Sequence, residues 1–223
     1  PSLGARFSEP SEDICHKRYL STRHITYREV QVVMPLVELV NHGGRAAGYD
    51  LKDGIAVSGN FDEEVLVNYC PEDCWSMAVA YGFCESRNYA YSARAAFKFE
   101  DYRIEISREF SQAKRFKGFM LPLVDVQDSV IRFPFLILGN TRSPRMPRAV
   151  FLQVTKNTPI QRPDELFDLI QHYNRMLFLK FLRASEGVET PPTVMLRSAA
   201  LQQLETLSSH WGTRSLAAGP ENS

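Results

Sequence analysis

The sequence lacks a net charge and has no long apolar run. Its 26 lysines and arginines balance 26 aspartates and glutamates over 223 residues. No overall field therefore favours DNA, RNA or an anionic membrane, although a local patch could still bind one. No apolar run reaches the ~18 residues that span a bilayer, and the first residues do not resemble a signal peptide. We therefore expect an intracellular, cytoplasmic protein with no membrane partner and no strong nucleic-acid signal. The sequence does not indicate its oligomeric state.

Cysteine is scarce, with residues Cys15, Cys70, Cys74 and Cys84. The last three lie close in sequence, which raises the alternative of a zinc site. Structural zinc sites use four ligands, usually in closely spaced pairs, and only three cysteines lie together here. We therefore predict no metal site, and reduced, partly buried thiols of the kind found in cytosolic proteins.

Familiar catalytic motifs are also absent. The sequence contains no G-x-S-x-G, Walker A, H-E-x-x-H or dinucleotide-binding pattern, which argues against several common enzyme classes. It has no internal repeat. What remains is an ordinary globular composition, 44% hydrophobic and 23% charged, in a chain long enough to bury a core.

Short strands are expected in the first third of the chain. Residues 25–34 form a partly alternating, β-branched run that is typical of a strand. Residues 48–51 and 55–58 flank an Asp-Gly pair, and Asp-Gly between extended runs predicts a hairpin. Residues 65–69 predict one more strand.

A buried helix and a second hairpin are expected next. Asp73 is a suitable N-cap for a helix over residues 74–80, which is apolar nearly all round and therefore buried. Residues 95–110 predict a hairpin that turns at Glu100-Asp101, and their alternation of apolar and charged residues predicts one wet face. Residues 130–138 are ambiguous between strand and helix.

The last third predicts helices. Residues 142–148 hold two prolines and three arginines and are expected to be irregular. One helix should begin at Pro163 and another should span residues 193–208. The first of these helices carries an apolar stripe at three- and four-residue spacing: Leu166, Phe167, Ile170, Tyr173, Leu177, Phe178 and Phe181. The whole chain therefore predicts an α+β fold, with small β-sheets and a buried helix in residues 1–90, then a β-hairpin and a helical region in residues 91–223.

One ordered set of segments stands out. Residues 35–42 read PLVELVNH, residues 63–69 read EEVLVNY, and residues 81–83 read YGF. This set resembles the catalytic half of SET-domain protein lysine methyltransferases, of the kind related to the Rubisco large-subunit lysine methyltransferase. Order and spacing match over roughly residues 20–90, under half of the chain. The resemblance implies SET-like sheets in the first part of the fold.

The resemblance implies an S-adenosyl-L-methionine-dependent protein lysine N-methyltransferase that acts on a lysine side chain of a protein substrate. Tyr81 and Tyr69 match tyrosines that line the lysine channel, and they are the implied catalytic residues. Asn41 and His42 match the pair that contacts the cofactor, and Phe83 would pack near its adenine.

Two further residues are implied to shape the substrate side of the pocket. Residues 21–25 resemble a segment that precedes the N-H motif in the family, which assigns Arg23 to this pocket. Glu38 stands where the family usually has an aspartate, so its carboxylate is displaced by one methylene.

The sequence departs from the family in several places. Gly43 replaces a serine, Cys74 replaces an asparagine, and the G-x-G cofactor loop of the family is absent. We therefore expect either a segment of a longer protein or a reduced homologue that binds the cofactor weakly. The alternatives are a non-catalytic SET remnant that binds a peptide, and an unrelated α+β binding domain.

Overall fold

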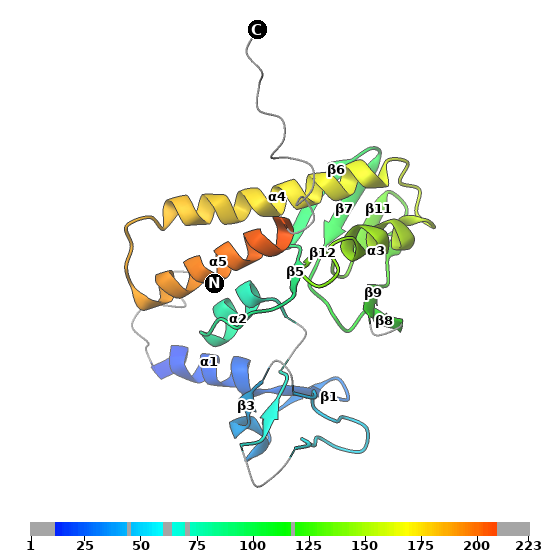
Figure 1. Cartoon of the computed structure of the whole chain (residues 1–223). Coiled ribbons are helices and arrows are strands. Elements are labelled where there is room, and N and C mark those ends of the chain that lie inside the picture. Colours follow the sequence, from blue (N-terminus) through cyan, green and yellow to red (C-terminus); the bar gives the residue numbers. More distant parts are fainter. Residues whose placement is uncertain (1–11, 44–45, 60–63, 70–71, 117–118, 209–223) are drawn as a thin grey trace. The chain divides into compact units, whose positions relative to one another are not determined.

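A computed structural model describes residues 12–43, 46–59, 64–69, 72–116 and 119–208. In these ranges the chain forms five α-helices, one short 3-10 helix and twelve short strands, arranged as one four-stranded and four two-stranded sheets (Figure 1). The predicted mixture of small sheets and helices is confirmed. The SET-like arrangement of these elements stays a prediction.

The chain divides into two compact units. The first comprises residues 1–72 and 76–85, and the second comprises residues 73–75 and 86–223. The assignment of residues 1–90 and 91–223 to domains with separate roles stays a prediction.

The first unit begins with helix α1 (Glu12–Arg23), followed by a hairpin of β1 (Ile25–Tyr27) and β2 (Val30–Val32). The prediction of a single strand over residues 25–34 is therefore wrong. The hairpin turns at Arg28 and Glu29, whose φ angles are 48° and 67°. Two-residue turns with positive φ normally use Asn or Gly, so this turn has no signature in the sequence. Helix α1 was missed because its apolar residues form no stripe.

Two short strands carry the segments that flank the site. Strand β3 (Asn41–His42) pairs in parallel with β4 (Leu66–Val67), and the short helix η2 (Val37–Leu39) precedes β3. A Cβ atom at Gly43 would lie 2.9 Å from the Cβ of Leu66, so the close approach of β4 favours glycine at this position. The hairpin predicted for residues 48–58 is reduced to one bridge, between Asp50 and Ala56.

Helix α2 (Cys74–Tyr81) confirms the predicted helix. As expected it is buried, with no exposed surface at Cys74, Met77 or Ala78. It ends at Gly82, which has a φ of 78° and donates its N–H to the carbonyl of Ala78 at 3.1 Å. Glycine is the usual residue at this position after a helix because it adopts positive φ without strain.

The prediction of reduced thiols is wrong for two cysteines. Cys74 and Cys84 are disulfide-bonded, whereas Cys15 is an exposed free thiol and Cys70 lies outside the described residues. Disulfides are rare in cytosolic proteins. The expectation of a cytoplasmic protein can therefore no longer be argued from reduced cysteines, and that location stays a proposal.

The second unit contains a four-stranded sheet in the order β10-β11-β7-β6. Strands β6 (Ala95–Phe99) and β7 (Tyr102–Ile106) form the predicted hairpin. Strand β11 (Val130–Phe133) pairs in parallel with β7 and antiparallel with β10 (Asp125–Gln127). Residues 130–138 thus resolve into strands, because β12 (Ile137–Asn140) follows.

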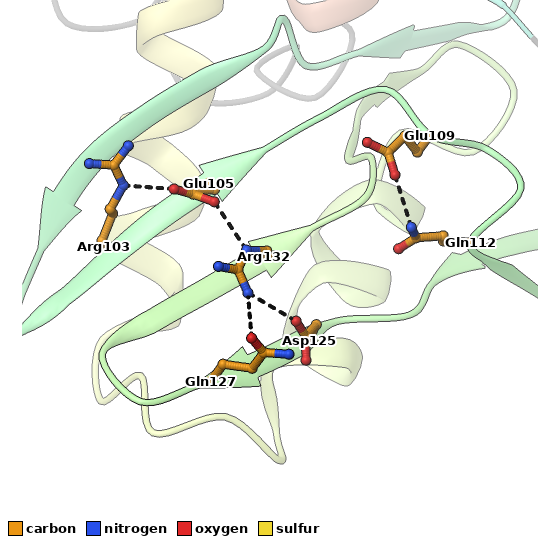
Figure 2. A network of polar contacts seen from close by, with 7 residues as sticks. All are labelled: Arg103, Glu105, Glu109, Gln112, Asp125, Gln127 and Arg132. Carbon is orange, nitrogen blue, oxygen red and sulfur yellow. Dashed lines mark hydrogen bonds and ion pairs between the residues drawn. The ribbon is translucent and has the colours of Figure 1, made fainter.

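The two faces of this sheet differ as the alternation predicted. One face buries Ile104, Ile106, Ile131 and Phe133 in the main hydrophobic core. The other face is polar: Arg132 lies between Glu105 and Asp125, with N–O distances of 3.1 and 3.2 Å, and Arg103 donates to Glu105 at 2.7 Å (Figure 2). The predicted wet face is confirmed.

Three helices contribute further residues to this core: α3 (Met146–Thr155), α4 (Pro163–Ala184) and α5 (Pro191–Ser208). The start of α4 at Pro163 and the predicted terminal helix are confirmed. Helix α3 was missed, and the prediction of irregular structure for residues 142–148 is wrong from Met146 onward, since Pro147 lies in the first turn of α3, where proline is tolerated. The predicted stripe of α4 also included Tyr173, which is 41% exposed.

The remaining strands form two small ladders. Strand β5 (Tyr89–Tyr91) pairs antiparallel with β12, and β8 (Ala113–Phe116) pairs antiparallel with β9 (Phe119–Pro122). Helix α5 packs on β12 so closely that a Cβ atom at Gly139 would lie 2.5 Å from the carbonyl oxygen of Thr206.

The turn of the β6–β7 hairpin is tied to the start of α4. The Glu100 carboxylate accepts the backbone N–H groups of Gln161 and Arg162 at 3.1 and 3.0 Å. These bonds, led by the one from Gln161, hold the pKa of the Glu100 carboxyl below its usual range.

Candidate functional site

Six of the seven predicted site residues line one cavity of about 400 Å³ in the first unit. Its lining residues lie at the end of α1, in β3, just after β4, and at and just after the end of α2. They are Thr22, Arg23, Asn41, His42, Tyr69, Tyr81 and Phe83. The seventh residue, Glu38, lies in η2, but its side chain is outside what the structure describes. Its predicted role stays a prediction.

Backbone pairing explains why these residues converge. The parallel ladder of β3 and β4 pairs Asn41 with Leu66 and His42 with Val67, so Tyr69, two residues after β4, lies beside His42. Tyr81 is the last residue of α2, and Gly82 then redirects the chain. The cavity thus depends on four separate segments of the sequence.

His42 links these segments through both of its ring nitrogens. Its Nδ1 accepts the backbone N–H of Tyr69 at 3.1 Å, and its Nε2 lies 2.9 Å from a carboxylate oxygen of Glu85. The ring centroid of His42 is 4.9 Å from that of Tyr69 and 5.6 Å from that of Phe83. His42 is therefore a structural centre of the site as well as part of its wall.

The tyrosines form an aromatic wall. The ring centroid of Tyr81 lies 5.3 Å from that of Tyr69 and 6.1 Å from that of Phe83. Burial raises the pKa of Tyr69, and the positive charge of Arg23 partly opposes this effect. Tyr69 therefore stays a neutral phenol at ordinary pH and is not a strong base.

Asn41 and Arg23 bring polar groups to the cavity. The Asn41 side chain donates to a carboxylate oxygen of Glu64 at 2.7 Å, which holds the amide in place. Arg23 is the last residue of α1 and is half-buried at the cavity. Its guanidinium is a permanent cation.

Sequence reasoning missed Tyr49 and Glu85. Tyr49 lines a smaller cavity, of about 30 Å³, together with Tyr69 and Tyr81. Burial raises the pKa of Tyr49, and the nearby Tyr69 raises it further. The positive charge of Arg23 lowers it by a smaller amount. The available signal for Tyr49 was its position shortly before the Asp-Gly pair. No local sequence pattern indicates the contact between Glu85 and His42.

In the described parts of the chain, no group of three or more His, Cys, Asp or Glu residues is placed to hold a metal ion. Among the helices described, none has both the length and the apolar character needed to cross a bilayer.

Comparisons with known proteins add little. No family model and no curated protein matches the sequence. A crystal structure of the SET domain of LSMT bound to lysine and AdoHcy is similar at a TM-score of 0.42 and 15% identity. The similarity covers 92% of this chain and 56% of the other, so this chain spans little more than half of that chain's length. A similarity at this level assigns no family and no activity.

Proposed function

We propose that this chain carries the lysine-channel side of a SET-type, S-adenosylmethionine-dependent protein lysine N-methyltransferase. The observation that carries the proposal is the convergence of Asn41, His42, Tyr69, Tyr81 and Phe83 on one cavity. These residues, in this order, are those on which the resemblance to the family depends, and they come from segments far apart in the sequence.

The cavity fits the ligands in size and chemistry. Its volume of about 400 Å³ lies within the range of small-molecule sites. The rings of His42 and Phe83 offer apolar faces suited to an adenine, and those of Tyr69 and Tyr81 offer an apolar wall for the stem of a lysine. When bound, S-adenosylmethionine would supply a methyl group on a sulfonium, and the lysine nitrogen would bond to that methyl carbon in line with the breaking C–S bond, so that S-adenosylhomocysteine leaves.

The residues of the cavity favour a neutral, oriented amine. Free lysine titrates near ~10.4, so the reactive amine must lose a proton before it attacks. The guanidinium of Arg23 disfavours an ammonium nearby through like-charge repulsion. Tyr69 uses its hydroxyl proton to bond the carbonyl of Val40, which leaves its oxygen lone pairs to accept an N–H of the amine. The released proton passes to solvent, so the site needs no strong base.

The test is methyl transfer to peptides. The chain would be incubated with isotopically labelled S-adenosylmethionine and an array of lysine-containing peptides, and label on lysine would be detected by mass spectrometry. Tyr81→Phe and Tyr69→Phe should reduce transfer. Tyr173→Phe, at an exposed position on α4, is the matched control and should leave transfer unchanged.

The second candidate is a peptide-binding module without catalysis. It is favoured by one observation, the absence of a G-x-G loop from the sequence. Peptide binding that depends on Tyr69 and Tyr81, without methyl transfer and without S-adenosylhomocysteine binding, would replace the enzyme with this candidate.

A further inference from the structure

Glu85 is the acidic partner of a buried histidine at the wall of the cavity. The His42 side chain is 4% exposed, and its Nε2 atom lies 2.9 Å from the Glu85 carboxylate, which is 36% exposed. Glu85 follows Phe83 by two residues, and both belong to the first unit with His42. The carboxylate therefore comes from the segment that follows α2 and contacts the edge of the ring at Nε2.

The partners of His42 determine where its ring proton resides. A backbone N–H can only donate, so Nδ1 of His42 must accept from Tyr69 through an unprotonated lone pair. The remaining ring proton is then on Nε2. An ionised carboxylate can only accept, so Nε2–H donates to Glu85. The two hydrogen bonds require the same tautomer.

The opposite tautomer would break both contacts. A proton on Nδ1 would face the N–H of Tyr69, and an unprotonated Nε2 would face the carboxylate of Glu85. Because the ring packs against Tyr69 and Phe83, a loss of its orientation would move two walls of the cavity. A group that holds the second nitrogen of a functional histidine commonly sets its tautomer in this way.

We propose that Glu85 is a positioning residue that holds His42 in the Nε2–H tautomer and so keeps the cavity wall in place. For catalysis this inference rests on the proposed function. Both ring nitrogens of His42 are engaged, so the ring contributes shape and hydrogen-bond order to the site and does not take the proton of the lysine amine.

The direct test is the tautomer of His42, measured by long-range ¹H–¹⁵N NMR on the chain labelled with ¹⁵N-histidine. His24 is an internal reference, because its Nδ1 lies 2.8 Å from the carbonyl oxygen of Leu20 and must donate to it. We expect the Nε2–H pattern for His42 and a protonated Nδ1 for His24. The His42 signal is assigned by its loss in His42→Gln.

Two substitutions separate positioning from packing. Glu85→Gln keeps a carbonyl oxygen that can accept from Nε2–H, so His42 should keep its tautomer. Glu85→Ala removes the acceptor, so the Nε2–H pattern should give way to a mixture. Glu189→Ala, which removes the partner of Arg197 in the second unit, is the matched control. An Nδ1–H ring in the wild type, or an unchanged pattern in Glu85→Ala, would overturn the proposal.

Ligand binding links this result to the proposed function. Glu85→Ala should weaken binding of S-adenosylhomocysteine by about 10-fold or more, and Glu85→Gln should restore much of the loss, at melting temperatures that show both variants folded. Equal losses in both variants would contradict the positioning role. If the wild type does not bind S-adenosylhomocysteine even at millimolar concentration, the proposed function fails, while the tautomer experiment still decides the role of Glu85.

Discussion

The hydroxyl of Tyr69 donates a hydrogen bond to the carbonyl oxygen of Val40, over 2.7 Å. Val40 immediately precedes strand β3, which carries Asn41 and His42. The phenol therefore bonds to the same segment whose histidine accepts the Tyr69 backbone N–H. Tyr69 thus donates both of the hydrogen bonds that join it to this segment, and the phenol keeps the bond to Val40 only while it holds its proton.

The stability of the chain should decrease at high pH because of its tyrosines. Burial raises the pKa of both Tyr49 and Tyr69 above the ordinary value. The native state then holds protons that the unfolded chain releases. The resulting stability is fully present below about pH 10 and is lost as the pH rises through the native pKa values. Urea unfolding at about pH 9 and about pH 11 measures the loss.

The matching control is the double variant Tyr49→Phe with Tyr69→Phe. It should lose less stability over the same pH interval, because it lacks both phenols. Tyrosinate absorbance followed during the titration should also lose its latest-titrating component in this variant. An equally steep loss of stability in the variant would show that other groups cause it.

Tyr81→Phe should lower methyl transfer by at least ~10-fold, which corresponds to ~1.4 kcal/mol of barrier. Cofactor affinity should change little, because the substitution keeps the ring that packs against Tyr69 and Phe83. Steady-state kinetics with a peptide substrate, together with calorimetry for S-adenosylhomocysteine, separate the two quantities. Unchanged turnover would reduce Tyr81 to a packing residue.

The chain by itself should bind S-adenosylmethionine weakly, closer to millimolar than to micromolar. The sequence has no G-x-G loop, and each tenfold loss of affinity corresponds to only ~1.4 kcal/mol. The aromatic side of the cavity alone would then provide the binding. Isothermal titration calorimetry is the measurement, and micromolar binding would contradict the prediction by showing that the cavity already holds the whole cofactor.

Gly139→Ala should destabilise the second unit by about 1–3 kcal/mol, the usual range for overpacking. The added Cβ atom would lie 2.5 Å from the backbone oxygen of Thr206, so β12 and α5 would have to separate. Gly54→Ala is the control, since nothing lies within 4 Å of a Cβ atom built there. Chemical denaturation of both variants should show a loss only at Gly139.

Elements with a strong local signal were predictable. The apolar helix after Asp73, the alternation in residues 95–110 and the proline at the start of α4 each depend on neighbours within a few residues. Helix α1 and the turn at Arg28 and Glu29 lack such signals, and the structure alone reveals them. The disulfide-bonded state of Cys74 and Cys84 was mispredicted, because spacing alone does not show which cysteines are oxidised.

The site was predictable only in part, for a related reason. The order of the motifs indicated which residues would share a cavity, and six of them do. Their partners come from pairing that the sequence does not display, such as the approach of Glu85 to His42 and of Glu64 to Asn41. Tyr49 was missed because its position beside Tyr69 and Tyr81 in the smaller cavity depends on tertiary contacts that the sequence does not display.

The contact of Glu100 with the start of α4 has a consequence for the order of folding. The carboxylate that holds the N–H groups of Gln161 and Arg162 comes from a hairpin about sixty residues upstream. The chain just before Pro163 thus gains these bonds only after β6 and β7 have paired. The amide hydrogens of Gln161 and Arg162 should consequently exchange rapidly in any partly folded species that lacks the hairpin, and they should acquire protection together with β6 and β7.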